Sequence, residues 1–292
     1  MDNRAEIREF LATRRAKITP DQVGLPAGTG LRRVPGLRRE EVAVLAGVST
    51  DWYVRLEKGH IDGVSDDVLD AVARALQLDD AERLHLFNLA RTAKPQRTAR
   101  RRKTQPAVRD SVRRVVDSMS TPAFVRNGRL DVLAINALGR ALYAPAFEDP
   151  GQPVNMARFC FLDPASQVFY PDWEQVARAT VAVLRSTAGR DPHDRELTDL
   201  VGELATRNDF FRTEWASHNV TLHQHGSKHF QHPLVGLIDV TFDSMELPAD
   251  PGLTLTAYST EPGSPSEDAL KLLASWTAAP ASAPASAPVE KH

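Results

Sequence analysis

The stretch Arg39–Gly59 constrains this chain more than any other part of its 292 residues. It reads as two short helices joined by a tight turn, with Gly47 where the backbone needs a positive φ angle and Gly59 at the end of the second helix. Small and apolar residues occupy the interior positions of such a pair: Val42, Ala43, Ala46, Val48, Tyr53 and Leu56. The pattern predicts a helix-turn-helix, although similar helical hairpins also occur in bundles that bind no nucleic acid.

The second helix of this pair has a polar outer face. A helix about 10–12 Å across fits the major groove of B-DNA, and the residues of its first turns reach the base edges. Arginines precede the pair, in and after a Gly/Pro-rich stretch, and are expected on phosphates unless that stretch is only a solvated loop. The candidate DNA-binding residues are Arg32, Arg33, Arg38, Arg39, Ser49, Thr50, Asp51 and Arg55.

Three more amphipathic segments complete a helical domain, because a bare helix-turn-helix buries too little surface to fold alone. They span 7–17, 66–76 and 81–90, so we expect an all-α domain of about five helices over residues 1–91. Residues 1–106 carry 20 Lys and Arg against 15 Asp and Glu, whereas 107–292 carry 16 against 23. Unless this asymmetry is an accident of composition, the basic half has the charge that phosphate binding requires.

Composition limits the remaining possibilities. Residues 92–106 are basic and almost free of apolar side chains, which predicts a linker, and 278–292 is an Ala/Pro/Ser tail that we expect to be disordered. The single Cys160 excludes an intrachain disulfide and fits a reducing cytosol. No apolar run approaches the ~20 residues that span a bilayer, and the N-terminus lacks a signal-peptide core. We therefore expect a cytoplasmic protein with no membrane contact.

From residue 107 to 277 the pattern changes to an α+β domain. Asn127-Gly128 separates two short β-like runs and predicts a hairpin with a type I′ turn. Six strands are expected, over 123–126, 130–135, 220–225, 228–232, 236–244 and 254–259. Helices are expected over 108–119, 136–143, 173–188, 194–207, 210–218 and 266–276. This order predicts a small antiparallel sheet with helices on one face, similar to PAS domains.

Motifs for catalysis are missing from the sequence. It contains no nucleophile elbow, Walker A loop or complete dinucleotide fingerprint, so we expect no enzyme. Histidines do gather in one region: His218, His223, His225, His229 and His232. His223 and His225 alternate at a spacing that metals use on strands, but no cysteine lies nearby. Polar histidines on a sheet face are the alternative to a metal site, and we expect no metal.

The chain also resembles known families. Leu56-Glu57-Lys58-Gly59 ends the second helix as in the Cro/C1 (XRE) repressor class. The whole chain is similar to actinobacterial MmyB-like regulators through Val34–Ala43, Leu130–Asn136, Phe161–Pro164, Asp172–Ala177, His232–Gly236 and Tyr258–Pro265. The resemblance implies a C-terminal domain that holds a small hydrophobic ligand, with fatty acids as the suggested class and no other cofactor. Tyr53 departs from the family's smaller aliphatic residue, so the crossing of the two helices is expected to differ.

The resemblance implies a cavity, although ordinary core packing is the alternative for each lining residue. The predicted ligand-binding residues are Phe124, Leu133, Ile135, Asn136, Tyr143, Phe161, Trp173, Arg178 and Trp215. An acyl ligand also needs a cation or amide at the mouth of the cavity. Asn136, Arg178 and Arg185 are the candidates for that role.

A ligand-responsive transcription regulator is the leading hypothesis. A single recognition helix reads too few base pairs to select one genomic site, which predicts a homodimer on a double-stranded operator. Because the linker is too polar to transmit a signal by packing, a ligand is expected to act through dimer geometry. The alternatives are a constitutive DNA-binding protein whose second domain serves dimerisation or partner docking, and a metal sensor.

Overall fold

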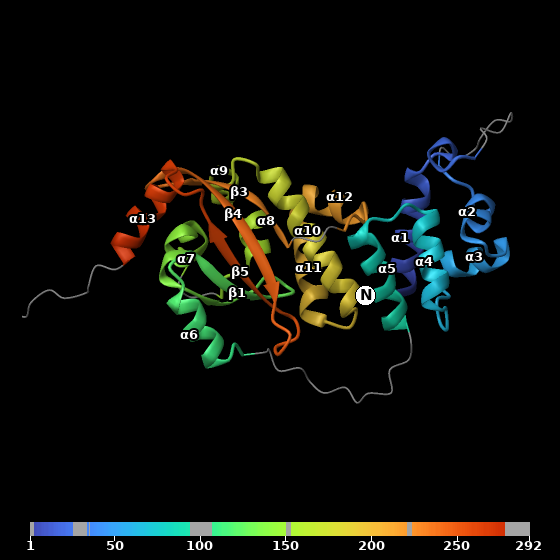
Figure 1. Cartoon of the computed structure of the whole chain (residues 1–292), viewed down its shortest axis with the longest axis horizontal. Coiled ribbons are helices and arrows are strands. Elements are labelled where there is room, and N and C mark those ends of the chain that lie inside the picture. The colour runs from blue at the N-terminus through green and yellow to red at the C-terminus, as the bar shows by residue number, and fades with distance from the viewer. Residues whose placement is uncertain are drawn as a thin grey trace, which may run out of the picture.

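The computed structural model describes residues 3–25, 34, 36–93, 107–149, 153–220 and 224–277. They form a helical N-terminal domain beside an α+β C-terminal domain (Figure 1). This confirms the expected fold class, with a five-stranded antiparallel sheet in the second domain. The predicted linker lies almost entirely outside the described residues, and the predicted tail lies wholly outside them.

The described part of the N-terminal domain contains five α-helices, as expected, and one short 3-10 helix. They are α1 (Asn3–Lys17), η1 (Pro20–Val23), α2 (Arg39–Ala46), α3 (Thr50–Glu57), α4 (Asp66–Ala75) and α5 (Asp80–Ala93). One core joins them, to which α1 contributes Ile7 and Phe10, while α2 contributes Val42 and α3 contributes Leu56. The apolar spacing of each helix therefore places its buried face against the same centre.

Two glycines and one serine shape the helix-turn-helix. Gly47 ends α2 with a φ of 70°, a conformation that costs glycine no Cβ clash. The Ser49 hydroxyl then caps α3 by accepting a hydrogen bond from the Trp52 amide at 3.2 Å. At Gly59 a Cβ would lie 2.7 Å from the Arg4 carbonyl oxygen, so only glycine lets the end of α3 approach α1 this closely.

The C-terminal domain begins with a helix, a hairpin and four short helical segments: α6 (Asp110–Ser118), β1 (Ala123–Asn127), β2 (Val132–Ile135), α7 (Ala137–Leu142), η2 (Ala144–Phe147), α8 (Met156–Leu162) and α9 (Ala165–Phe169). It continues with α10 (Trp173–Arg190), α11 (Arg195–Arg207), α12 (Asp209–Ala216), β3 (His225–His232), β4 (Gly236–Glu246), β5 (Leu253–Ser259) and α13 (Pro265–Thr277). The strands follow the order β2-β1-β5-β4-β3, and every neighbouring pair is antiparallel.

Helices cover both faces of this sheet, so the expectation of helices on one face is wrong. Phe124, Phe242 and Tyr258 face a core shared with α7, α8, α9 and α13. On the opposite face, Val125 packs against Val116 of α6. The α6 helix has this position because its strongly amphipathic pattern leaves an apolar stripe that must be buried.

The β1–β2 hairpin is confirmed, but its type I′ turn is wrong. Leu130, not Asn127 or Gly128, has the positive φ, and its amide bonds to the Asn127 carbonyl at 3.1 Å. Gly128 instead serves close packing, because a Cβ there would lie 2.5 Å from the Thr187 methyl group on α10. The Asn-Gly pair therefore sets the distance between the hairpin and α10.

Two further segments bear on the expectations. The strand expected over 220–225 is described only at its ends: Val220 is buried and belongs to no strand, and His225 begins β3, while residues 221–223 lie outside the described ones. Helices α8 and α9 were not expected. They have seven and five residues, too few for a 3.6-residue periodicity to stand out.

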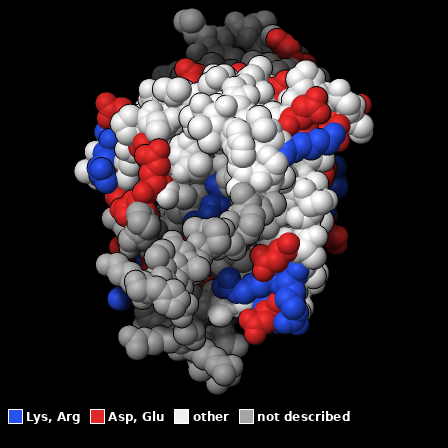
Figure 2. Space-filling view, turned by 90° about the vertical axis from the view of Figure 1, so that its left-hand side faces the viewer, with Lys and Arg blue, Asp and Glu red and all other residues white. Residues whose placement is uncertain are grey.

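The end of the molecule that carries α13 has a broad area without charged side chains, with acidic and basic groups mainly around its margin (Figure 2). Leu272 and Trp276 of α13 are among the exposed large apolar residues.

Within the described ranges, no helix has both the length and the apolar character needed to cross a lipid bilayer.

Candidate DNA-binding surface and ligand pocket

Helix α3 lies at the end of the N-terminal domain that is far from the second domain (Figure 1). Thr50, Asp51 and Arg55 are exposed on it, whereas Tyr53 and Leu56 on the other face are at most 1% exposed. Ser49 is also exposed, but its hydroxyl caps the helix. The fold therefore offers the three exposed side chains to a groove, and their contacts with bases remain predictions.

The arginines predicted to bind phosphates have different surroundings. Arg38 precedes α2, and its guanidinium lies 3.3 Å from Glu40. Arg39 pairs with Glu57 at 3.2 Å and keeps 51% of its side chain exposed. Arg32 and Arg33 lie outside the described residues. Arg39 thus has a structural partner, and its contact with phosphate remains a prediction.

Glu57 holds the helix-turn-helix together from inside. Its carboxylate is 2% exposed and receives hydrogen bonds from Arg15 at 2.9 and 3.2 Å and from Arg39 at 3.2 and 3.3 Å. Burial alone lowers the pKa of Arg15, but the bonds to Glu57 outweigh it and raise that pKa. Helices α1, α2 and α3 are therefore joined by one charge, which the sequence showed only as part of the helix-ending motif.

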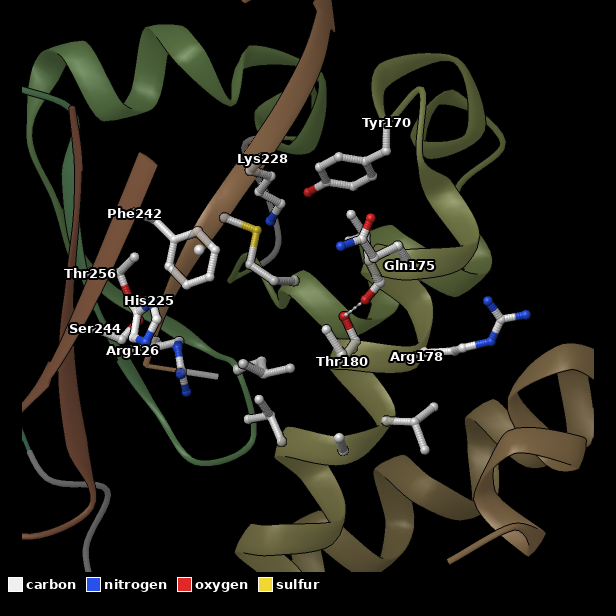
Figure 3. A pocket seen from close by; sticks show the side chains of 18 of the residues that line it. Arg126, Tyr170, Gln175, Arg178, Thr180, His225, Lys228, Phe242, Ser244 and Thr256 are labelled. Carbon is white, nitrogen blue, oxygen red and sulfur yellow. Dashed lines mark hydrogen bonds between the residues drawn. The ribbon is translucent and has the colours of Figure 1, made fainter. Parts of the chain in front are cut away.

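A pocket lies between the sheet and α10 (Figure 3). Its volume is about 510 Å³, within the roughly 300–1,000 Å³ typical of small-molecule sites. Strands β1, β3, β4 and β5 form one wall, and the part of α10 from Gln175 to Val183 contributes the opposite one. Most of the surface is aliphatic or aromatic, which suits an apolar ligand.

Two cations enter this apolar space from the sheet. Arg126 of β1 is 8% exposed, and burial lowers its pKa to about 10. Lys228 of β3 has its Nζ 3.4 Å from the Tyr143 hydroxyl, and burial lowers the pKa of Lys228 to about 8. Among the described lining residues Glu214 is the one acid, and it pairs with Arg178 at 3.3 Å. The pocket is therefore positively charged inside.

Aromatic groups surround the Lys228 ammonium. Its Nζ lies 4.9 Å from the ring centre of Tyr170 and 5.6 Å from that of Phe230, distances typical of cation–π contacts. The hydroxyls of Tyr143 and Tyr258 are 2.5 Å apart, and burial raises the pKa of both well above the ordinary value. Both phenols therefore stay neutral. One donates its O–H to the other, so one O–H of the pair is left to donate elsewhere.

Three of the predicted ligand residues line this pocket. They are Phe124, Tyr143 and Arg178. Arg178 lies at the rim, with 53% of its side chain exposed and a second ion pair, to Glu174, at 2.8 Å. Its guanidinium points away from the other labelled side chains (Figure 3). Its two acidic partners already neutralise it, so it is a weaker anion site than Arg126 or Lys228.

The other predicted ligand residues lie elsewhere. Asn136 caps α7 through the Gly139 amide at 2.7 Å and also accepts from the Ala123 amide at 3.1 Å. The rest pack in three places: Leu133 on the α6 side of the sheet, Ile135 beside α7, and Phe161, Trp173 and Trp215 among α8, α10, α11 and α12. Arg185, the third candidate for the mouth, is fully buried against the N-terminal domain.

A simple signal could have found Arg126 and Lys228, the two cations that enter the pocket from the sheet. Side chains two apart on a strand share a face, so Arg126 lies with Phe124 and Lys228 lies with Phe230. Both phenylalanines are in the core. A charged residue at the inward position of a predicted strand thus indicates a polar site within the core.

The histidines have separate partners. His229 Nδ1 lies 2.5 Å from Asp172, and His232 Nε2 lies 3.0 Å from the Ala141 carbonyl. His225 lines the pocket, while His218 is buried next to the N-terminal domain and not on the sheet. His223 lies outside the described residues, and within those that are described no three potential ligands gather around one point.

Family comparisons agree with this architecture. Residues 108–273, more than half of the chain, match the family described as the MmyB-like transcription regulator ligand binding domain. Residues 7–86 match a family described as a helix-turn-helix domain. A search among curated proteins finds no match. Both matched families are those of transcription regulators and not of enzymes. The chain belongs to the MmyB-like transcription regulators, with a DNA-binding helix-turn-helix domain ahead of a ligand-binding domain.

Proposed function

We propose that this regulator changes its affinity for a DNA operator, in the cytoplasm, when its second domain binds a hydrophobic ligand with an anionic head, of the fatty-acid class. One observation carries the proposal: Arg126 and Lys228 enter an apolar pocket that gives neither of them an acidic partner among its described lining residues. The family match supports the two domain assignments, and the residues that line the pocket support the class of ligand.

The charge argument is physical. An unpaired cation in a poorly solvated site costs free energy, and the lowered pKa values of Arg126 and Lys228 express that cost. A carboxylate between them would stabilise both charged forms, and the remaining O–H of the Tyr143–Tyr258 pair could donate to one of its oxygens. Aliphatic and aromatic walls would take the chain of the ligand. A neutral lipid would leave both cations without compensation.

Calorimetry with the delipidated full-length protein tests this ligand class. Palmitate should bind at least about tenfold more tightly than hexadecanol, which has the same chain and no charge, because a hydrogen bond to a charged group contributes roughly 1.5–3 kcal/mol. R126M and K228M should each lower palmitate affinity about tenfold and leave hexadecanol unaffected. R158M, which removes a surface arginine of α8 paired with Glu203, is the matched control.

Two results would count against the ligand proposal. Equal binding of palmitate and hexadecanol would show that the cations do not select the head. Binding of neither, with DNA binding intact, would favour the alternative in which the second domain serves dimerisation or partner docking.

We further propose that the protein binds its operator as a homodimer. The described recognition surface of one chain consists of a single short helix, α3, of eight residues. One such helix contacts only a few base pairs, which is too little information to select a genomic site. Light scattering and footprinting should give a dimer and two half-sites. A monomer that protects one half-site at saturation would overturn this proposal.

A further inference from the structure

The two domains meet at a largely buried polar cluster, which we call the interdomain cluster: Glu6 of α1, which is partly buried, and the buried Arg185 of α10 and His218 after α12. The Arg185 side chain has no exposed surface; it donates to the Glu6 carboxylate and to the Trp215 carbonyl, and stacks over the Trp215 ring at 4.2 Å. His218 Nδ1 lies 2.8 Å from the Arg185 guanidinium and 3.3 Å from Glu6. Buried charge pairs of this kind hold two surfaces in one register.

A second set of contacts extends this interface along the chain. Arg14 of α1 donates to the His218 carbonyl and lies 3.3 Å from the Asn219 side-chain oxygen. Lys17 reaches the same oxygen at 2.6 Å. Val220 is 5% exposed and packs into the core of the N-terminal domain. Residues 218–220 belong to the ligand-binding domain in sequence, but they pack with the DNA-binding domain.

The same segment is also a wall of the ligand pocket. Asn219 and Val220 line the pocket, as do eight residues of α10 between Gln175 and Val183. Two residues after Val183, that helix supplies Arg185 to the interdomain cluster. One turn further, Gly189 lies so close to α5 that a Cβ there would be 2.6 Å from the His85 ring. Figure 1 shows α10 reaching from the sheet to α5. The pocket and the DNA-binding domain thus share one wall.

This shared wall is imperfectly hydrogen-bonded. Both ring nitrogens of His85 are buried without a hydrogen-bond partner among the described residues, the nearest carboxylate oxygen being that of Glu6, 3.8 Å from Nε2. The Nε atoms of Arg14 and Arg185 are in the same condition. Buried networks with unmade bonds lose little when they rearrange, because the bonds that would resist a shift are missing. The interface is therefore suited to a second arrangement.

We propose that pocket occupancy is transmitted to the DNA-binding domain within one chain, through residues 218–220 and α10 and their contacts with α1 and α5. A ligand that presses on Asn219, Val220 and the pocket face of α10 changes the interdomain cluster, and this resets the position of α3. The inference rests on the proposed function, because it takes the pocket as the ligand site. It replaces dimer geometry as the first step of the signal.

Two variants of the full-length protein test the route with palmitate as the probe. E6Q removes the charge at the centre of the cluster, and the double variant E6Q/R185M removes both partners, so that no buried charge is left unpaired if the single variant folds poorly. E203Q, on the surface of α11, is the matched control. Palmitate should shift operator affinity about 5–150-fold in the wild type and in E203Q. In the two cluster variants the shift should fall below about twofold while palmitate affinity itself stays within about threefold.

A measurement without any ligand separates the two proposals. A179F fills the pocket from α10, and hydrogen exchange of α1 and α5 should change in this variant. The same substitution in the E6Q/R185M background should leave exchange in α1 and α5 unchanged relative to that background. If palmitate does not bind but A179F alters exchange in α1, the ligand class is wrong and the route stands. If palmitate shifts DNA affinity equally in wild type and cluster variants, or if A179F changes exchange only within the second domain, the route is wrong.

Discussion

Two glutamates of this protein, the buried Glu57 and the partly buried Glu6, have different partners and therefore different consequences. Among the described residues, Glu57 receives four hydrogen bonds from two arginines of its own domain, Arg15 and Arg39, at 2.9 to 3.3 Å. Glu6 joins two domains, and its neighbours include two histidines, His85 and His218. Arginine keeps its charge at any ordinary pH, whereas histidine does not. The Glu57 carboxylate fixes α1, α2 and α3 relative to one another, and we call this unit the reading head. The Glu6 carboxylate connects α1 with α10 in the interdomain cluster, and we call this adjustable contact the joint.

The largest effect is expected at Glu57. E57A leaves Arg15 nearly buried without its partner, which should lower the free energy of unfolding by roughly 3–5 kcal/mol, nearer the lower value because Arg39 is half exposed. E203A, which removes a surface carboxylate, should cost about 0–1 kcal/mol. Chemical denaturation gives both numbers. Similar losses in the two variants would mean that Glu57 does not fix the helix-turn-helix.

Substitution of Arg55 tests whether the DNA affinity of the reading head can be lowered without lowering its stability. R55A should weaken binding to an operator selected from random DNA by roughly 1–3 kcal/mol and leave the free energy of unfolding unchanged, since Arg55 is exposed on α3. R83A, on α5, is the matched control. Competition binding with operator and random DNA makes the distinction. Equal losses on both DNAs would show that Arg55 contacts phosphate.

Acid should weaken the joint before it weakens the reading head. Burial lowers the pKa of His85, with Glu6 opposing, so the unfolded state binds the proton more readily. The stability that His85 contributes is present above its ordinary pKa of 6.5 and is lost as the pH falls through the lower folded value. Glu6 acts in the same direction at lower pH. Burial raises the pKa of Glu6, but its neighbours His218 and His85 and the charge of Arg185 outweigh burial and lower that pKa.

Hydrogen exchange at pH 7.5 and pH 5.5 checks this order. Protection at the α1–α10 contact should drop at the lower pH while the α2–α3 contact keeps its protection. H85Q should flatten the response between these two pH values. A parallel loss in both regions, or an unchanged response in H85Q, would contradict a difference between the two glutamates.

The smallest effect concerns the pocket. Because the pKa of Lys228 is about 8, its ammonium loses the proton as the pH rises from 7 to 9. Palmitate affinity should therefore fall several-fold over that range, whereas K228M should show a flat profile because Arg126 stays charged. Calorimetry at three pH values gives the comparison. A wild-type profile as flat as that of K228M would remove Lys228 from the ligand site.

The reading head was predictable because its signals are local. Gly47, Gly59 and the spacing of Val42, Ala43 and Leu56 lie within twenty-one residues, and the structure buries all three apolar residues there. The sheet and its long helices were predictable for the same reason. The pocket could be predicted only in part. Strand alternation identifies Lys228 and Arg126 as inward-facing residues, because it shows which face each strand buries.

The joint could not have been predicted from sequence patterns. Glu6, Arg185 and His218 are separated by 179 and 33 positions along the chain, and no periodicity connects them. A sequence pattern shows Arg185 as a helix arginine like Arg178, yet one is buried and the other half exposed. Their difference comes from which side of α10 meets another domain, and that is a property of the assembled fold.

The place of Val220 in the N-terminal core has a consequence for modularity. A fragment that ends after α5 lacks this side chain, so its core has an unfilled position where the sensor domain normally contributes packing. The N-terminal domain therefore depends on the second domain to complete its core. A chimera that joins this ligand-binding domain to a foreign DNA-binding domain would need an apolar site for Val220 and counterparts of Glu6, Arg14 and His85. A chimera without them should bind its effector and leave its promoter unregulated.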